Sequence, residues 1–239
     1  MQISGKTILI TGGTDGIGLR LAQQLRSKGA IVIITGRNAQ RIAAATADGF
    51  QVISGDLTTD AGMKATIAAA KQAHIDVLIN NAGMGTGYEI DDPATLAEAD
   101  VSITLNVNAP IHLITHLMND LKARPEAMIV NVTSGLAIAP RAGGAVYCAT
   151  KAALRSYTLA LRALLKDSNV HVLEALPPVV DTQMTAGRDG GKLSPEVCAA
   201  QIISAMERNA REANVGMVKI LRVVYSISPA LVRAIMIRF

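Results

Sequence analysis

Short hydrophobic runs rich in isoleucine and valine alternate along the chain with longer, alanine-rich segments in which apolar residues recur at helical spacing. Short continuous apolar runs are typical of strands that are buried on both faces of a sheet. The runs lie at residues 6–11, 30–35, 50–54, 76–80, 127–134 and 170–176. The segments between them predict helices near residues 17–28, 39–47, 61–73, 94–122 and 145–166.

This alternation predicts how the strands pair. A strand that is followed by a helix and then by a second strand returns in parallel through a right-handed crossover. The sequence therefore predicts an α/β fold, a doubly wound and mostly parallel sheet flanked by helices on both faces, as in the Rossmann fold. Because no linker, repeat or low-complexity stretch interrupts the alternation, we expect residues 1–239 to form a single domain.

Two segments after the sixth predicted strand need separate interpretations. The glycine-rich residues 185–195 follow a strand end, where a doubly wound sheet places its ligand, so we expect them to form a lid over the substrate. Residues 215–221, VGMVKIL, fit either a seventh strand or the start of a helix.

Residues 213–239 are an apolar, basic C-terminal arm. Residues 1–212 contain 19 basic and 19 acidic side chains, so the whole net charge of +4 comes from Lys219, Arg222, Arg233 and Arg238. One interpretation of the arm is a helix on a membrane surface. We favour an arm that covers the substrate cleft or packs across a subunit contact, because Pro229 breaks a helix there.

The composition narrows the class of partner and the compartment. Only 3% of residues are aromatic and tryptophan is missing, so base-stacking platforms for nucleic acid are not expected. Cys148 and Cys198 have neither zinc nor disulfide spacing, which favours a reducing compartment, and Cys148 is expected to pack rather than to act in redox chemistry. The first residues lack the pattern of a secretory signal, and the longest uncharged stretch of the arm is too short to span a bilayer. We expect a cytoplasmic protein.

The first strand runs through a glycine-rich turn, GGTDGIG, into the first helix. Gly12, Gly16 and Gly18 allow a sharp turn, the close approach of a diphosphate and close packing of the helix on the sheet. The start of the helix presents free N–H groups and the positive end of its dipole to phosphates. Plain strand-to-helix turns show the same pattern, so its position after the first strand is what supports a dinucleotide site.

The end of the second strand bears on which dinucleotide binds. An acid there bonds the ribose hydroxyl of NAD, whereas an arginine accommodates the additional phosphate of NADP. The sequence has Arg37 at this position, which favours NADP(H) over NAD(H). Asp15 in the glycine turn weighs slightly in the other direction, because its negative charge opposes a phosphate. The alternative is that Arg37 is only a solvated residue at the start of a helix.

Tyr147 and Lys151 stand one helical turn apart in VYCATK and share a helix face. The lysine charge favours the ionised phenol, so the pair predicts a proton donor and acceptor that works near neutral pH. The structural alternative is a surface pair with its polar ends in solvent. Ser134 ends the fifth predicted strand, thirteen residues before Tyr147, and can hydrogen-bond an oxygen that gains charge.

Polar motifs also follow the third, fourth and sixth predicted strands. They are Asp56 in SGDLT, residues 80–83 (NNAG) and residues 177–182 (PPVVDT). Because a doubly wound sheet binds its ligand at the carboxyl ends of its strands, all of these motifs are expected at one edge.

With these motifs in this order, residues 5–185 resemble the classical short-chain dehydrogenase/reductase family. The resemblance implies hydride transfer between a nicotinamide cofactor and a carbonyl or secondary alcohol, with Tyr147 as the general acid and base. It implies that Lys151 also holds the nicotinamide ribose and that Asn106 positions a water beside the lysine, with Asn108 as a competing candidate. The implied catalytic residues are Asn106, Ser134, Tyr147 and Lys151.

The resemblance also implies a set of cofactor contacts. The residues are Gly12, Gly16, Ile17, Gly18, Arg37, Asp56, Leu57, Asn80, Ala82, Gly83, Tyr147, Lys151, Pro177, Val180 and Thr182. Within this set, Asp56 is implied to receive the adenine amino group and Thr182 to bond the nicotinamide carboxamide. Pro177-Pro178 replaces the usual Pro-Gly, which resembles a bacterial subgroup and removes one amide donor beside the nicotinamide.

Weaker signals concern metal, anion and partner binding. His112, His116 and Asp120 share one helix face without a further ligand, so we expect a polar face at a subunit contact and no metal site. Arg141 and Arg188 are candidates to bind an anionic part of the substrate. We expect a homodimer or homotetramer that acts on a small-molecule carbonyl or alcohol. The alternative function is a catalytically silent NADP(H)-binding scaffold or regulatory protein, recruited to a membrane through its arm.

Overall fold

The computed structural model describes residues 1–188 and 190–238. Within these residues seven strands form one sheet, in the spatial order β3-β2-β1-β4-β5-β6-β7, and all neighbouring pairs are parallel. The strands are β1 (Thr7–Ile10), β2 (Ile31–Gly36), β3 (Gln51–Ser54), β4 (Val77–Asn80), β5 (Ala127–Val132), β6 (Val170–Leu176) and β7 (Glu212–Asn214). The strand order reverses between β1 and β4, so their carboxyl ends border the crevice in which such sheets bind ligands. The predicted fold class is confirmed.

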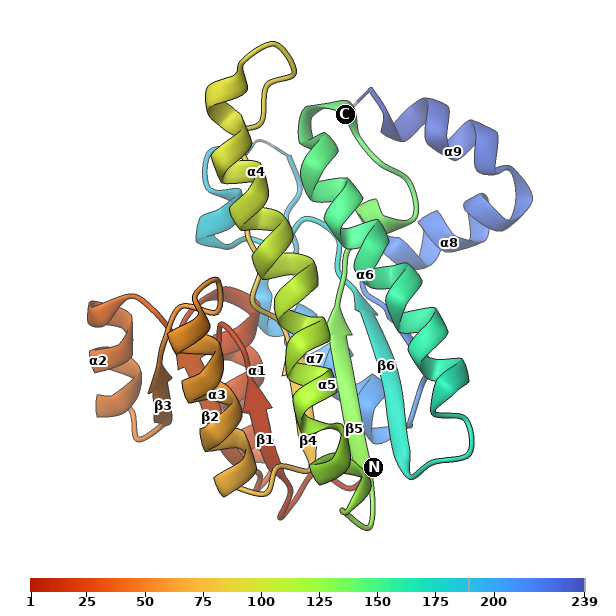
Figure 1. Cartoon of the computed structure of the whole chain (residues 1–239). Helices are drawn as coiled ribbons and strands as arrows, with labels where there is room; N and C mark the ends of the chain where they lie inside the picture. Colours follow the sequence, from red (N-terminus) through yellow and green to blue (C-terminus); the bar gives the residue numbers. More distant parts are fainter. Residues whose placement is uncertain (189, 239) are drawn as a thin grey trace.

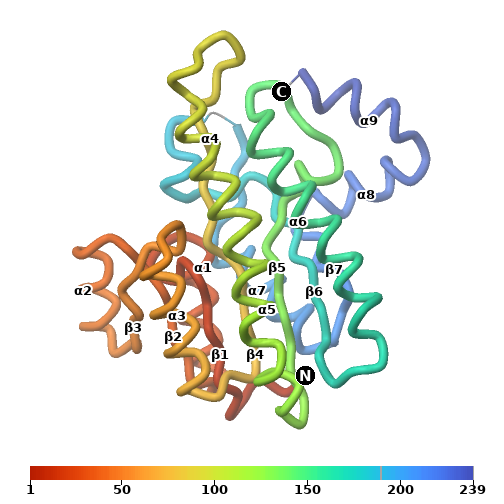
Figure 2. Tube along the Cα trace, viewed as in Figure 1, coloured from red at the N-terminus to blue at the C-terminus, as the bar shows by residue number. Residues whose placement is uncertain are grey.

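Helices cover both faces of the sheet (Figure 1). They are α1 (Gly16–Ser27), α2 (Ala39–Ala47), α3 (Asp60–Gln72), α4 (Leu96–Ile103), α5 (Ala109–Lys122), α6 (Ala145–Leu164), α7 (Pro195–Glu207), α8 (Val218–Ile227) and α9 (Pro229–Met236). One face packs against α1, α2 and α7, and the other against α3, α5 and α6. Figure 2 shows α8 and α9 outside both layers, beyond the carboxyl end of the sheet and near the start of α6.

The central strands are buried on both faces because successive side chains point to opposite layers. In β1, Ile8 and Ile10 enter the core that includes α1 and α7, while Leu9 enters the core that includes α3 and α5. In β4, Ile79 and Leu78 divide between the two cores in the same way. Two apolar layers around one sheet therefore explain why these runs are continuously hydrophobic.

The helix predicted over residues 94–122 is one helical segment that contains a wider turn. A 3-10 turn at Pro93–Thr95 leads into α4, and a π-helical segment at Thr104–Asn108 joins α4 to α5. Single π-helical turns inside α-helices occur frequently at functional sites. Asn106 lies in this turn and is fully buried.

The C-terminal arm folds back over the end of the sheet. The ambiguous residues 215–221 lead into α8, and the seventh strand lies just before them at Glu212–Asn214. The predicted break at Pro229 is confirmed, because α8 ends at Ile227 and Pro229 opens α9. The arm is tied down near the start of α6, where the Ala142 N–H donates to the Ile237 carbonyl at 3.3 Å.

Residues 195–207 form α7, a helix that the hydrophobic pattern did not predict. The signals were present: Ser194 caps the helix by accepting from the Val197 N–H, and Pro195 occupies its first position. None of the helices in the described residues combines the length and the hydrophobicity needed to cross a bilayer.

Candidate active site

The β1–α1 turn is built by close approach of backbones. Gly12 has a φ of 63°, a conformation that favours glycine. A Cβ added at Gly18 would lie 2.3 Å from the Gly12 carbonyl oxygen, so only glycine fits. Asn81 closes the turn from β4 by donating its side-chain amide to the Thr11 and Gly12 carbonyls at 3.0 and 3.2 Å. The predicted dinucleotide turn therefore has the tight geometry that brings the N-terminus of α1 to the edge of the sheet.

A cleft of about 670 Å³ runs from this turn along the carboxyl ends of the strands, and we refer to it as the polar cleft. Most of the residues predicted from the sequence line it. They are Gly12, Gly16, Ile17, Arg37, Asp56, Leu57, Ala82, Gly83, Ser134, Tyr147, Lys151, Pro177, Val180 and Thr182. A Cβ added at Gly16 would meet the Thr182 side chain at 3.0 Å, which shows how closely the two sides of the cleft approach. A narrow polar groove that starts at a helix N-terminus fits an extended dinucleotide.

Three predicted residues, Gly18, Asn80 and Asn106, do not line the cleft themselves. Gly18 packs α1 against the turn. Asn80 is buried in β4 and donates to Asn131 Oδ1 on β5 at 2.8 Å, so it joins the central strands. Asn106 accepts a hydrogen bond from the N–H of Met84, a residue of the loop after β4 that lines the cleft.

Basic residues gather at the β2 end of the polar cleft. Arg37 Nη1 lies 2.7 Å from Asp56 Oδ2. Burial raises the pKa of Asp56, but hydrogen bonds from Thr58 and from Arg37 outweigh it and lower the pKa overall. Arg41, four residues further along, was not predicted from the sequence. It also lines the cleft, pairs with Asp15 at 3.1 Å and contacts the Gln183 side chain. Arg41 therefore offsets the negative charge of Asp15.

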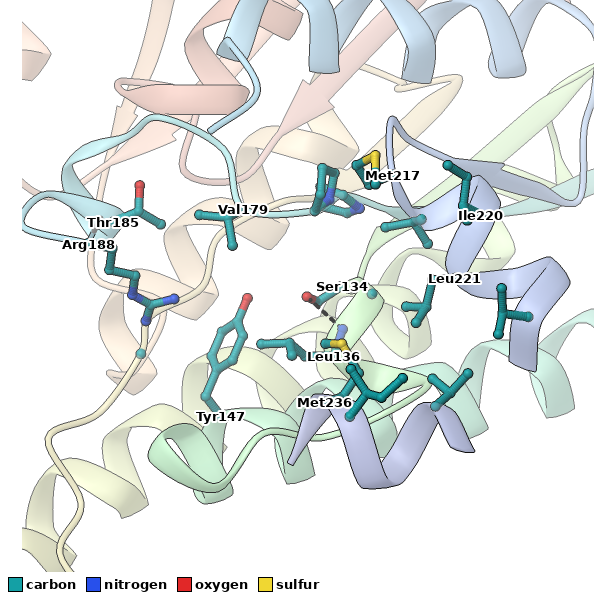
Figure 3. A pocket seen from close by; sticks show the side chains of 18 of the residues that line it. Ser134, Leu136, Tyr147, Val179, Thr185, Arg188, Met217, Ile220, Leu221 and Met236 are labelled. Carbon is teal, nitrogen blue, oxygen red and sulfur yellow. Dashed lines mark hydrogen bonds between the residues drawn. The ribbon is translucent and has the colours of Figure 1, made fainter. Parts of the chain in front are cut away.

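Ser134 and Tyr147 meet at the other end of the cleft. Figure 3 shows their hydroxyl groups next to each other, with Ser134 at the end of β5 and Tyr147 on α6. The Ser134 hydroxyl accepts a hydrogen bond from the Leu136 N–H at 3.1 Å, which fixes its position. Burial raises the pKa of Tyr147 to about 12, although the hydrogen bond with Ser134 lowers it.

Lys151 lies beneath the tyrosine ring. Its side chain is buried, with Nζ 3.0 Å from the Val132 carbonyl oxygen and 5.7 Å from the centre of the Tyr147 ring. Burial lowers the pKa of Lys151 to about 8. The expectation of a phenol with a lowered pKa is wrong here, because removal from water outweighs the electrostatic effect of nearby positive charge on Tyr147.

Asn106 ties the π-helical turn to the loop after β4. Its carbonyl oxygen accepts from the Met84 N–H at 2.9 Å, and its amide donates to the Met84 carbonyl at 2.9 Å. The same amide donates to Thr150 on α6 at 3.0 Å. A Cβ added at Gly83 would lie 3.0 Å from Asn106 Oδ1 and 3.2 Å from Lys151 Nζ. Asn106 thus holds the loop against the lysine.

A second cavity, of about 400 Å³, opens beside the hydroxyl pair (Figure 3). We refer to it as the apolar pocket. Ser134 and Tyr147 line both this pocket and the polar cleft. Side chains of α8 and α9 form one wall, so the C-terminal arm borders the same pocket as the hydroxyl pair. Arg188, from the predicted lid, also lines the pocket, while residue 189 of that lid lies outside the described residues.

Sequence reasoning missed a charged network behind the hydroxyl pair. Glu174 is fully buried in β6 and accepts from the Thr133 hydroxyl at 2.8 Å and from Arg155 at 2.5 Å. Arg155 also pairs with Glu212 at 3.2 Å, and Arg222 of α8 reaches the same carboxylate at 3.1 Å. The network therefore connects Thr133, the residue before Ser134, to the arm. An acid inside the apolar run of residues 170–176 was the available signal.

His112, His116 and Asp120 are not among the residues that line the polar cleft or the apolar pocket. Asp120 pairs with Lys71 at 3.8 Å, and the described residues hold no group of three or more potential metal ligands. Cys148 is buried on α6, with its sulfur 3.8 Å from the Arg141 carbonyl oxygen, as expected of a packing residue.

Comparison with known proteins assigns the chain to a family. A model of the short chain dehydrogenases matches residues 6–192. The chain belongs to the short-chain dehydrogenase family. The uncharacterized oxidoreductase DltE of Bacillus subtilis is 43% identical over 189 residues, which span 76% of this chain and 74% of that protein. Serine 3-dehydrogenase of Rhizobium radiobacter is 34% identical over 190 residues, which span 77% of this chain and 76% of that protein.

The dehydrogenase also has solved structural relatives. A short chain dehydrogenase from Burkholderia cenocepacia, in complex with NADP, covers 99% of both chains with a TM-score of 0.89 and 25% identity. As a member of this family, the protein is an oxidoreductase that acts on a CH–OH group with a nicotinamide cofactor. The family match ends at residue 192, so α7, α8 and α9 lie beyond it. The polar cleft is thus the shared part of this dehydrogenase, while the wall of the apolar pocket formed by the arm is not covered by the family model.

Proposed function

We propose that the dehydrogenase catalyses hydride transfer between NADP(H) and a carbonyl compound or secondary alcohol, with Tyr147 as the general acid and base. The observation that carries this proposal is the junction of the two cavities, because Ser134 and Tyr147 line both of them. A bound nicotinamide supplies the hydride for reduction and accepts it in oxidation. The protein's own residues position the substrate oxygen and move its proton.

Tyr147 gives its proton to the substrate oxygen that gains negative charge during reduction, and takes a proton back during oxidation. Ser134 donates a hydrogen bond to the same oxygen. With a pKa of about 12, the phenol is protonated at neutral pH and enters the reduction as an acid. An alkoxide is a stronger base than a phenolate, so the transfer remains favourable.

Lys151 acts from below the ring. Its ammonium group, 5.7 Å from the ring centre, stabilises the phenolate that forms when Tyr147 has given up its proton. It also holds the nicotinamide ribose. Asn106 keeps the Met84 backbone beside this lysine and so supports the water that relays protons to it.

The preference for NADP(H) rests on charge at the β2 end of the polar cleft. Arg37 and Arg41 both line it, and a phosphate on the ribose would receive charge-assisted hydrogen bonds from their guanidinium groups. Each arginine also faces a carboxylate, Asp56 or Asp15, which keeps the pair in place. The NADP bound to the Burkholderia cenocepacia relative supports this preference.

The remaining proposed contacts follow the cleft. Diphosphate, adenine and nicotinamide contacts are assigned to Gly12, Gly16, Ile17, Gly18, Asp56, Leu57, Asn80, Ala82, Gly83, Pro177, Val180 and Thr182. We further propose that residues 185–195 act as a lid, that residues 213–239 cover the substrate, and that the dehydrogenase is a homodimer or homotetramer. Light scattering of the purified protein tests the oligomer.

Replacement of the phenol tests the proposed function. In Tyr147→Phe the ring that packs over Lys151 is kept and only the hydroxyl is lost. We expect kcat for carbonyl reduction to fall by about 10² to 10⁴-fold, because the proton donor is missing. The affinity for NADPH, measured by fluorescence titration, should stay within about twofold.

Two results would count against this function. Full activity of Tyr147→Phe would show that the phenol is not the acid. A parent protein that binds NADPH but oxidises none of it against a broad panel of aldehydes and ketones would favour the silent scaffold instead. Ser134→Ala serves as a matched variant, because it removes the supporting hydroxyl and leaves the acid; its loss of kcat should be the smaller one.

A further inference from the structure

The apolar pocket is enclosed by aliphatic side chains from segments that are distant in the sequence. Leu136 follows β5, Val179 follows β6, and Leu221 and Val232 come from α8 and α9. Gly135 allows this closure, because a Cβ there would lie 2.9 Å from Val218 Cγ2. Walls of this kind favour an aliphatic group and give no partner to a polar one.

Among the described residues that line the apolar pocket, Arg188 alone carries a charge. It is half-buried, and no carboxylate in the described residues pairs with its guanidinium group. Burial lowers the pKa of Arg188, and the charge of neighbouring Arg141 lowers it further. A partly desolvated cation that faces a second cation gains most from an anionic ligand.

In Figure 3 the guanidinium group of Arg188 and the aliphatic side chains of the arm lie apart from each other. The guanidinium group of Arg188 lies on one side of the Tyr147 hydroxyl, and the aliphatic side chains of the arm, including Leu221 and Met236, lie on the other. Arg188 also acts electrostatically on Tyr147, so the cation is close to the proposed reacting position.

We infer that the substrate carries an anionic group on one side of its reacting carbon and an aliphatic chain on the other. Arg188 binds the anionic group, a carboxylate being the simplest, while the chain lies under α8 and α9. This inference rests on the proposed function and deepens it by giving the substrate class. A small hydroxy amino acid fits poorly, because it has no aliphatic chain to cover the apolar walls and would leave them in contact with water.

A matched series of alcohols tests the two ends separately. Initial rates of NADP⁺ reduction are measured with β-hydroxybutyrate, β-hydroxyoctanoate and the methyl ester of each. The ester removes the charge and retains the rest of the molecule. We expect kcat/KM to rise with chain length and the acids to exceed their esters by roughly ten- to hundredfold.

The Arg188→Gln variant identifies the source of the acid preference. It should lower the ratio of acid to ester kcat/KM by roughly ten- to hundredfold, through KM rather than kcat. Lys192→Gln is the matched control, because Lys192 stands on the same segment but faces Asp181 and the Thr185 carbonyl, and it should leave the ratio unchanged.

The outcomes separate this inference from the proposed function. If esters and acids react equally well, or if Arg188→Gln leaves the ratio intact, the inference is wrong while the oxidoreductase function stands. A higher kcat/KM for serine than for β-hydroxyoctanoate would also overturn it. If no alcohol or carbonyl compound reacts at all, the proposed function fails first.

Discussion

The polar cleft and the apolar pocket meet at the same two hydroxyl groups but are constructed differently. Much of the polar cleft is lined by short loops directly after strands, such as the β1–α1 turn and the segments after β4 and β5, so these residues are close in sequence to the sheet that positions them. The apolar pocket is closed by α8 and α9, which return from the far end of the chain to the start of α6. In the proposed function, the sheet and its loops therefore recognise the cofactor, whereas the arm adds a wall to the substrate pocket.

The two regions also differ in what holds them. Close backbone contacts fix the polar cleft, as at Gly18, where even a methyl group would meet the Gly12 carbonyl at 2.3 Å. Besides the backbone hydrogen bond from Ala142 to Ile237, the arm is held by side chains, through the Glu212–Arg222 pair and the packing of Val218 and Leu221 near Gly135. Substitutions in the arm are therefore expected to change substrate preference while the cofactor site is retained.

The largest effect expected for this comparison is on cofactor preference. Replacing both Arg37 and Arg41 by alanine removes the two guanidinium groups from the polar cleft. We expect the ratio of kcat/KM for NADPH to that for NADH to fall by roughly hundredfold, because two charge-assisted hydrogen bonds are lost. Steady-state rates with each cofactor and one fixed carbonyl substrate measure this ratio.

A remote cation provides the control for this double variant. Lys64→Ala also removes positive charge, but Lys64 is exposed on α3 and pairs with Asp60, so the ratio should not change. An unchanged ratio in the double variant would mean that the arginines are solvated residues and that the argument for NADP(H) is wrong.

The sequence predicted the polar cleft better than the apolar pocket for a physical reason. Glycine turns, buried strands and strand-end polar residues obey local rules, so the observed strand ends differ from the predicted ones by at most two residues. Arg41 was missed because its approach to the cleft depends on α2 packing beside the glycine turn. The raised pKa of Tyr147 was missed because burial is a property of the whole fold. The run VGMVKIL stayed ambiguous because seven residues show too little periodicity.

A moderate effect is expected at Tyr147 and Lys151, near the junction of the two regions. There the rate of carbonyl reduction should depend on pH. The pKa of Lys151 is lowered to about 8, so its ammonium group loses its proton as the pH rises through that value. The charge that stabilises the phenolate is then lost, and the initial rate of carbonyl reduction should fall by roughly tenfold for each further pH unit. Tyr147, with a pKa of about 12, remains protonated over this range and does not cause the fall.

The reference for the pH profile is the ordinary pKa of a solvated lysine. If the rate stays constant until about pH 10.4, the ordinary value for lysine, then burial does not lower the pKa of Lys151 in the working enzyme. Binding of NADPH measured across the same pH range distinguishes loss of the cofactor from loss of proton transfer.

The smallest effect is expected in the arm. Leu221→Ala removes part of the aliphatic wall opposite Tyr147, next to Gly135. We expect KM for a ketone with an aliphatic chain to rise by roughly five- to tenfold, because less apolar surface is buried on binding. The affinity for NADPH should not change.

The matched control is Val223→Ala, on the same helix but outside the pocket lining and 60% exposed, which should alter neither KM nor the affinity for NADPH. Equal effects of the two variants on KM would show that the arm acts through its own stability, and a loss of NADPH affinity in Leu221→Ala would show that arm and cleft are one unit rather than two.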